Sequence, residues 1–199
     1  MKGWIIALAL LSAAPALAQD KLSPGAGPSI VVVETEKGTF EFETYPNEAP
    51  KTVAHILGLV EKRFYNGQRV HRAVAGFVVQ FGDQQTRDMT KEKMWGRIEG
   101  PAVGVAEFSK LRTHVRGAVA LAHNGDASKA DTQMYITLAD TPRLNGKYVV
   151  FGKVISGMDV VDKLKYSDRI IRVTARAAKS RRVPRDPESA QPAPAASAQ

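Results

Sequence analysis

Residues 70–83 read VHRAVAGFVVQFGD, and they predict two short strands that meet near Gly76. Apolar residues dominate both runs, as in a strand pair that packs on a core. Arg72 and Gln80 interrupt this pattern with a guanidinium and an amide. Taken alone, the stretch fits a half-exposed sheet whose wet face carries both polar groups. The alternative is that they belong to a functional site, and the rest of the chain bears on that choice.

The sequence around this stretch predicts a β-rich domain. Residues 30–34 and 39–45 read as a hairpin around a turn at 36–38, and a helix with one apolar face follows to about Lys62. Further strands are expected at 118–122, 134–138, 148–154 and 170–175, and a second helix at about 158–165. About eight strands with mostly hairpin-scale connections favour antiparallel closure into a barrel over parallel winding. The long connection from about Asp83 to Arg116 predicts short helices or a functional loop.

The first nineteen residues, MKGWIIALALLSAAPALAQ, have the pattern of a secretory signal peptide. Lys2 supplies the positive start, residues 5–11 the apolar run, and residues 16–18 an A-x-A cleavage signal. The apolar run is too short to span a bilayer, and Pro15 breaks it. We therefore expect cleavage after Ala18 and export to a bacterial periplasm, with secretion beyond it left open.

The remaining chain divides into a leader, one domain and a tail. Residues 19–29 form a Pro/Gly-rich flexible leader, residues 30–176 the domain, and residues 177–199 a basic and then Pro/Ala-rich disordered tail. The formal charge is +8, and the excess gathers near the domain's end. The basic residues there are Arg172, Arg176, Lys179, Arg181, Arg182 and Arg185. For an exported protein we expect weak contact of this end with an anionic envelope surface, and no nucleic-acid binding.

Motifs for metal, nucleotide or nucleophilic chemistry are missing from the sequence. No cysteine is present, which excludes disulfides, thiol nucleophiles and Cys-ligated metals, so a hydrophobic core must hold the domain. The four histidines show neither HExxH nor HxH spacing, and no Walker, GxSxG or dinucleotide fingerprint occurs. A triad of Ser109, His71 and Asp83 can be imagined, but nothing selects it. We expect no metal and no cofactor.

Several segments, in order, resemble one known family. VHRAVAGFVVQFGD is similar to the FHR…PGF..Q.GD segment of the cyclophilin-type peptidyl-prolyl isomerases, and FYNGQRVHR (64–72) fits its approach. RGAVALAHNG (116–125), TQMYI (132–136) and LNGKYVVFGKVISGMDVVDKL (144–164) resemble later segments of that family. Each motif alone is weakly specific, whereas the ordered set, from about Ile30 to Ala175, is specific.

The resemblance implies a closed eight-stranded antiparallel barrel capped by two α-helices. It also implies an isomerase acting on Xaa-Pro bonds, with Arg72 as the catalytic arginine and Gln80 as the catalytic partner that orients it. The residues implied in substrate binding are His71, Phe77, Val78, Ala122, His123, Gln133, Tyr135, Leu144 and Tyr148. Strict alternation places Phe77 and Val78 on opposite faces of a strand, so a bend or bulge near Gly76 is required.

The site region departs from the family pattern at five positions. Val78 stands where methionine is common, Tyr135 where phenylalanine, Arg143 where tryptophan, Tyr148 where histidine and Phe81 where glycine is usual. Retention of Arg72 and Gln80 favours an active enzyme over the alternative, a non-catalytic proline-peptide-binding or chaperone-like module. The expected partners are proline-containing polypeptides whose folding the protein assists after export, and the expected state is a monomer.

Overall fold

The computed structural model describes residues 27–97 and 100–178. The expected signal peptide, most of the leader and nearly all of the tail lie outside these ranges. Within them, no helix has the length and apolar character needed to cross a membrane.

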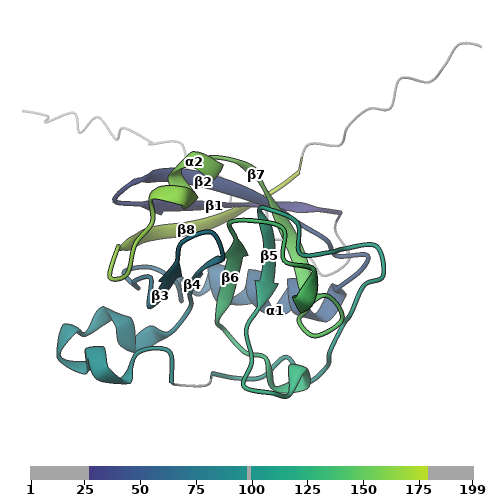
Figure 1. Ribbon diagram of the computed structural model, residues 1–199, viewed down its shortest axis with the longest axis horizontal. Coiled ribbons are helices and arrows are strands. Elements are labelled where there is room, and N and C mark those ends of the chain that lie inside the picture. Colours follow the sequence, from purple (N-terminus) through teal and green to yellow (C-terminus); the bar gives the residue numbers. More distant parts are fainter. Residues whose placement is uncertain (1–26, 98–99, 179–199) are drawn as a thin grey trace, which may run out of the picture.

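Eight antiparallel strands form a single sheet that curls on itself (Figure 1). The strands are β1 (Ser29–Thr35), β2 (Gly38–Thr44), β3 (Arg72–Val74), β4 (Val78–Phe81), β5 (Ala118–Leu121), β6 (Met134–Thr137), β7 (Val150–Ser156) and β8 (Ile170–Ala177). Their order in the sheet is β3-β4-β6-β5-β7-β2-β1-β8. The number of strands and their antiparallel sense agree with the prediction from the sequence.

Two α-helices and four short 3₁₀ helices complete the described fold. Helix α1 (Pro50–Glu61) packs against β8, and α2 (Met158–Lys163) lies beside β2 (Figure 1). The 3₁₀ helices are η1 (Gln84–Arg87), η2 (Met89–Met94), η3 (Ala127–Lys129) and η4 (Pro142–Leu144). The first two confirm that the long connection after β4 carries short helices.

The barrel is closed less completely than expected. The edge strands β3 and β8 form no ladder with each other, and a single bridge joins Arg69 to Arg169. Beside this bridge, Val70 N–H donates to the Asp168 carbonyl at 2.9 Å and Ile170 N–H to the Gln68 carbonyl at 2.8 Å. The seam is therefore sealed by the segment that precedes β3, because β3 itself is only three residues long.

Alternation along the strands produces an inner and an outer apolar layer. Val79, Ile136 and Phe151 point inward and are fully buried in the main core, into which Ile56 of α1 also packs. The opposite faces of β4, β5, β6 and β7 carry a second buried cluster outside the barrel. It consists of Tyr45, Val78, Ala118, Ala120, Tyr135 and Val150. Strands β5 and β6 are consequently buried on both faces.

The domain is slightly longer than the sequence indicated. Strand β1 already begins at Ser29, and β8 continues to Ala177. Ala178 N–H then donates to the Pro28 carbonyl at 2.9 Å. The pairing of β1 with β8 thus continues to Ser29 and Ala177, just outside the predicted limits of 30–176.

Candidate active site

The β3–β4 hairpin places Arg72 directly opposite Gln80. The turn between the strands covers residues 75–77, with Gly76 at φ +66°, a conformation that favours glycine. Phe77 N–H donates to the Val74 carbonyl at 3.0 Å and closes the turn. Phe77 thus belongs to the turn and not to β4, so strand alternation does not fix its direction. This removes the conflict between Phe77 and Val78 that the sequence raised.

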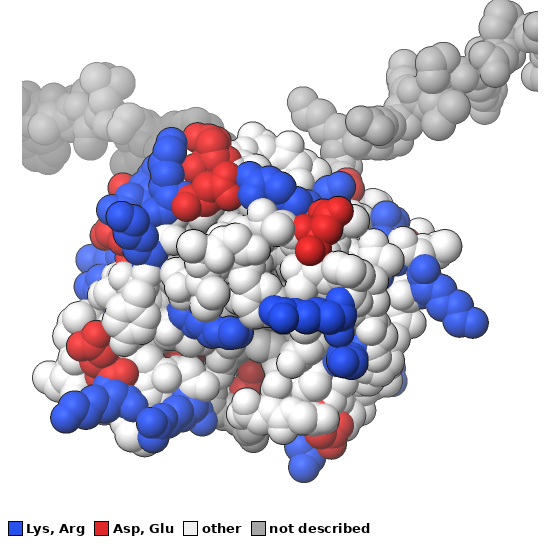
Figure 2. All heavy atoms as spheres, viewed as in Figure 1, with Lys and Arg blue, Asp and Glu red and all other residues white. Residues whose placement is uncertain are grey.

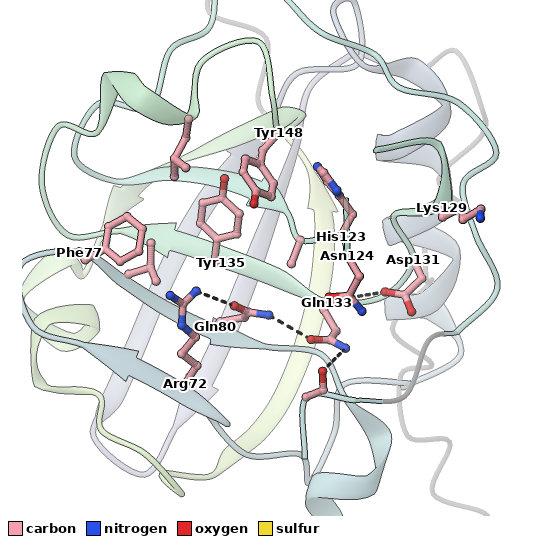
Figure 3. Close-up of a pocket in the computed structure, with 14 residues that line it drawn as sticks. Arg72, Phe77, Gln80, His123, Asn124, Lys129, Asp131, Gln133, Tyr135 and Tyr148 are labelled. Atoms are coloured by element: carbon pink, nitrogen blue, oxygen red, sulfur yellow. Dashed lines mark hydrogen bonds between the residues drawn. The ribbon is translucent and has the colours of Figure 1, made fainter. Parts of the chain in front are cut away.

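A directed chain of hydrogen bonds holds the Arg72 side chain. Arg72 Nη1 donates to Gln80 Oε1 at 3.4 Å, and Gln80 Nε2 donates to Gln133 Oε1 at 3.0 Å. Gln133 Nε2 in turn lies 3.5 Å from the Gly96 carbonyl oxygen. Figure 3 shows Arg72, Gln80 and Gln133 in a row along one side of a pocket, with Tyr135 and Tyr148 on the other. Each amide accepts from one neighbour and donates to the next, which fixes the orientation of Gln80.

The pocket beside this chain has a volume of about 230 Å³ and opens on the outer face of the sheet. Its walls combine the second apolar cluster with the polar row. The lining residues are Arg72, Phe77, Val78, Gln80, Gly96, Ala122, His123, Asn124, Lys129, Asp131, Gln133, Tyr135, Leu144 and Tyr148. All residues predicted for the site are present except His71. A cavity that joins an apolar wall to convergent polar groups is typical of a binding site for an organic ligand.

His71 does not line the pocket, although the resemblance implied substrate binding. Its ring packs behind the wall, where a Cβ added to Gly96 would lie 3.0 Å from the ring. Burial lowers the pKa of His71, and the Asp83 carboxylate and the Gln133 amide oppose that effect. His71 is the residue before β3, and its ring contacts Gly96, which itself lines the pocket.

A chain of polar groups anchors Tyr135, the residue in the middle of the pocket. Asn145 Oδ1 accepts the backbone N–H of His114 at 2.9 Å and lies 2.9 Å from His114 Nδ1, so Nδ1 carries the ring proton. Burial lowers the pKa of His114, and a neutral ring leaves Nε2 free to accept. The Tyr135 hydroxyl, 2.9 Å away, therefore donates to Nε2. Burial also raises the pKa of Tyr135 far above its usual value, so its hydroxyl stays neutral.

His123 forms the wall next to Tyr148. Its ring centroid lies 4.4 Å from that of Tyr148, and its Nε2 lies 2.8 Å from the Lys147 carbonyl oxygen. The carbonyl can only accept, so Nε2 carries the proton. This hydrogen bond and the ring contact join His123 to the segment after η4, so His123 and Tyr148 form one continuous wall of the pocket.

Several residues that line or support the pocket were not predicted from the sequence. Asp131 buries its carboxylate and accepts the backbone N–H groups of Gly100, Thr132 and Gln133, which fixes the segment that carries Gln133, directly before β6. The other new lining residues are Gly96, Asn124 and Lys129, and His114 and Asn145 lie behind the pocket. A charged residue directly before TQMYI was a visible signal for Asp131, whereas nothing in the sequence ties Gly96 or His114 to this site.

Comparison with known proteins gives the family. The family model described as "Cyclophilin type peptidyl-prolyl cis-trans isomerase/CLD" matches residues 30–183. The chain belongs to the cyclophilin family. It is accordingly a peptidyl-prolyl cis-trans isomerase, and the fold just described is the cyclophilin fold.

Relatives of this cyclophilin come from bacteria and from animals. It is 40% identical over 139 residues to a "Probable peptidyl-prolyl cis-trans isomerase" of Brucella abortus, covering 68% of this chain and 70% of the relative. It is 35% identical over 136 residues to the human "Peptidyl-prolyl cis-trans isomerase-like 3", covering 68% of this chain and 81% of that one. These matches span most of the cyclophilin domain.

Solved structures share the fold at lower sequence identity. A crystal structure of a Cryptosporidium parvum cyclophilin has a TM-score of 0.66 at 24% identity and covers 77% of this chain and 100% of its own. A second crystal structure of that protein, in the presence of the dipeptide Ala-Pro, has a TM-score of 0.65 at 23% identity, covering 75% of this chain and 99% of its own. Among the residues described in our cyclophilin, no three His, Asp or Glu side chains gather as a metal site would require.

Proposed function

We propose that this cyclophilin is exported and accelerates rotation about Xaa-Pro bonds in polypeptides that fold outside the cytoplasm, with Arg72 as the catalytic residue. The observation that carries the catalytic part is the placement of the Arg72 guanidinium. It is held by Gln80 and lies at the edge of a pocket of about 230 Å³ that has an apolar wall.

The reaction needs a group that favours the twisted amide over both planar forms. Rotation about an amide bond meets a barrier of about 18–20 kcal/mol because the bond has partial double-bond character. As it twists, conjugation is lost and the proline nitrogen becomes able to accept a hydrogen bond. A guanidinium that donates there binds the transition state more tightly than either ground state, which is the requirement for catalysis.

The polar row prepares Arg72 for this role. Gln80 accepts from Nη1 and is itself fixed by Gln133, so one edge of the planar guanidinium is occupied. The remaining N–H groups of Arg72 stay available for the substrate, because arginine offers five donors in a rigid plane. No ion pair to Arg72 occurs among the described residues, so no carboxylate competes with the substrate.

The magnitude of this contribution can be bounded. A hydrogen bond to a charged group contributes about 1.5–3 kcal/mol, which corresponds to about one to two decades in rate. Any further acceleration requires gripping the proline ring. Phe77, Val78 and Leu144 offer apolar surface for that ring, and Tyr135 presents its aromatic face because its hydroxyl is engaged by His114.

Export and partners are the second part of the proposal. The signal-peptide pattern in residues 1–18 supports delivery to the periplasm, where proline-containing polypeptides would be the substrates. The basic residues after Ala178 would make weak contact with an anionic envelope surface, and the protein would act as a monomer without nucleic acid.

Two measurements test the proposal. The first is an isomerase assay, in which the chain from Gln19 onward should accelerate isomerisation of an Xaa-Pro peptide over the uncatalysed rate. Arg72→Lys should lose at least about tenfold in kcat/KM, because an ammonium lacks the planar fork that reaches Gln80 and the proline nitrogen together. Lys110→Gln, which changes a lysine outside the pocket lining, is the control and should keep full activity. Full activity in Arg72→Lys would reject Arg72 as a shape-specific donor.

Intact-mass analysis of protein recovered from an exporting host tests localisation. The expected mass begins at Gln19. A recovered chain that retains residues 1–18 would contradict export with cleavage after Ala18.

A further inference from the structure

Two arginines share one aromatic ring at the mouth of the pocket. The guanidinium carbon of Arg143 lies 4.5 Å from the centroid of the Phe77 ring, and that of Arg72 lies 5.5 Å from the same centroid. Arg143 belongs to η4, next to the lining residue Leu144. Both arginine side chains are exposed. The Phe77 ring thus contacts two guanidinium groups, one from β3 and one from η4, beside the pocket.

These two cations lack carboxylate partners, whereas four other arginines of the described domain have one. Arg112 pairs with Glu48, Arg116 with Asp162, Arg172 with Glu34 and Arg176 with Glu41. In the part of the chain that the structure describes, no carboxylate lies within 4.0 Å of the guanidinium nitrogens of Arg72 or Arg143. In Figure 2, basic side chains near the middle of the face stand apart from acidic ones, whereas both kinds lie side by side at its upper edge.

The one acidic residue that lines the pocket does not neutralise this pair. Asp131 is 4% exposed, and its oxygens accept backbone N–H groups of Gly100, Thr132 and Gln133. Figure 3 places it at the opposite end of the pocket from Phe77. The electrostatic field at the Phe77 end is therefore positive and open to an incoming ligand.

We propose that this isomerase prefers proline peptides with an aspartate or glutamate next to the proline, bound by Arg143 at the Phe77 end of the pocket. The inference rests on the proposed function, since it names the substrate class for the same site. Arg143 is the specificity-determining residue. Its guanidinium is held in place by the Phe77 ring and offers several donors to a carboxylate. Arg72 adds positive charge but keeps its donors for the reacting amide.

The expected size of the preference is modest and depends on salt. Exposed ion pairs contribute little, so a Glu-containing peptide should exceed its Gln counterpart by about three- to fivefold in kcat/KM at low ionic strength. Screening at about 0.15 M salt should reduce that ratio, because the Debye length falls to about 8 Å. A Lys-containing peptide should be the poorest of the three.

The test compares matched peptides and matched variants. The peptides differ only in one residue, Glu, Gln or Lys, placed directly before the proline in one series and directly after it in another. The proteins are the wild type, Arg143→Gln and the control Lys110→Gln, which removes one charge outside the pocket lining. The readout is the ratio of kcat/KM for Glu over Gln peptides at low and at physiological salt.

We expect a ratio above about three in at least one series for the wild type and Lys110→Gln, and a ratio near one for Arg143→Gln. Equal treatment of Glu and Gln peptides by the wild type, or an unchanged ratio in Arg143→Gln, would overturn the proposal. Turnover of the Gln peptides by the wild type separates the two claims. If those peptides are isomerised without any Glu preference, the specificity proposal fails while the isomerase assignment stands.

Discussion

The buried chain behind the pocket leads to a prediction that joins stability and binding. His114 is 2% exposed. Its Nε2 accepts a hydrogen bond from the Tyr135 hydroxyl, and its Nδ1–H donates one to Asn145 Oδ1. His114→Leu introduces an apolar side chain of comparable bulk and leaves the Tyr135 hydroxyl buried without an acceptor. Tyr135→Phe creates the reverse defect, because Nε2 of His114 then loses its donor. The double variant removes both ends of the hydrogen bond.

The magnitudes follow from the cost of a buried unsatisfied group. Leaving one such group without a partner costs about 1–3 kcal/mol, whereas replacing both partners by apolar groups is nearly neutral. Each single variant should therefore lose about 1–3 kcal/mol in the free energy of unfolding. Because the double variant removes both partners, its loss should be smaller than the sum of the two single losses by at least about 1 kcal/mol.

Urea denaturation of the four proteins measures this coupling, and isomerase assays with one Xaa-Pro peptide measure its effect on the site. We expect KM to rise in His114→Leu, because the Tyr135 hydroxyl has lost its acceptor and the ring shifts to reach water or another acceptor in the pocket. In the double variant KM should return toward the wild-type value. Additive losses of stability, or an unchanged KM in His114→Leu, would show that His114 does not position Tyr135.

Three further predictions concern the pH dependence of stability, the C-terminal tail and the polar row of the pocket. Burial lowers the pKa of His55, His71 and His114 below their unfolded values, so the stability that their neutral forms contribute is present above about pH 6.5 and is lost as pH falls below it; urea midpoints that do not change from pH 7.5 to 5 would contradict this. A chain that ends at Ala178 should keep its Tm, because β8 is already complete; a drop of several degrees would show that the tail packs on the barrel. Gln133→Leu should lower kcat/KM severalfold because Gln80 loses its acceptor; an unchanged value in an isomerase assay would exclude any orienting role for the polar row.

Much of the fold could be predicted because its signals are local. The apolar runs on both sides of Gly76 form β3 and β4 as expected, and the spacing of apolar residues in α1 placed that helix within a residue or two. Ser29 of β1 and Ala177 of β8 pair with each other just outside the predicted limits, since pairing partners and not propensity decide where a strand ends. The incomplete closure at Arg69 and Arg169 is likewise a property of the whole sheet.

The site was predictable where resemblance supplied the residues and unpredictable where contacts are non-local. Phe77 reaches the pocket through the turn, a choice that strand alternation could not make. The position of His71 relative to the pocket could not be predicted, because its neighbour Gly96 comes from a long connection without a periodic pattern. The pairing of His114 with Tyr135 joins positions 21 residues apart and needs the completed sheet.

The central claim, that Arg72 stabilises the twisted amide, is tested most directly by separating turnover from binding in Arg72→Ala. Arg72 is exposed on the outer face, so the variant should fold, and its urea midpoint should be checked first. We predict a loss of at least about tenfold in kcat/KM, with peptide affinity measured by titration within severalfold of the wild type. A well-folded Arg72→Ala that keeps full isomerase activity would contradict the account and leave a proline-peptide binder as the better description of this pocket.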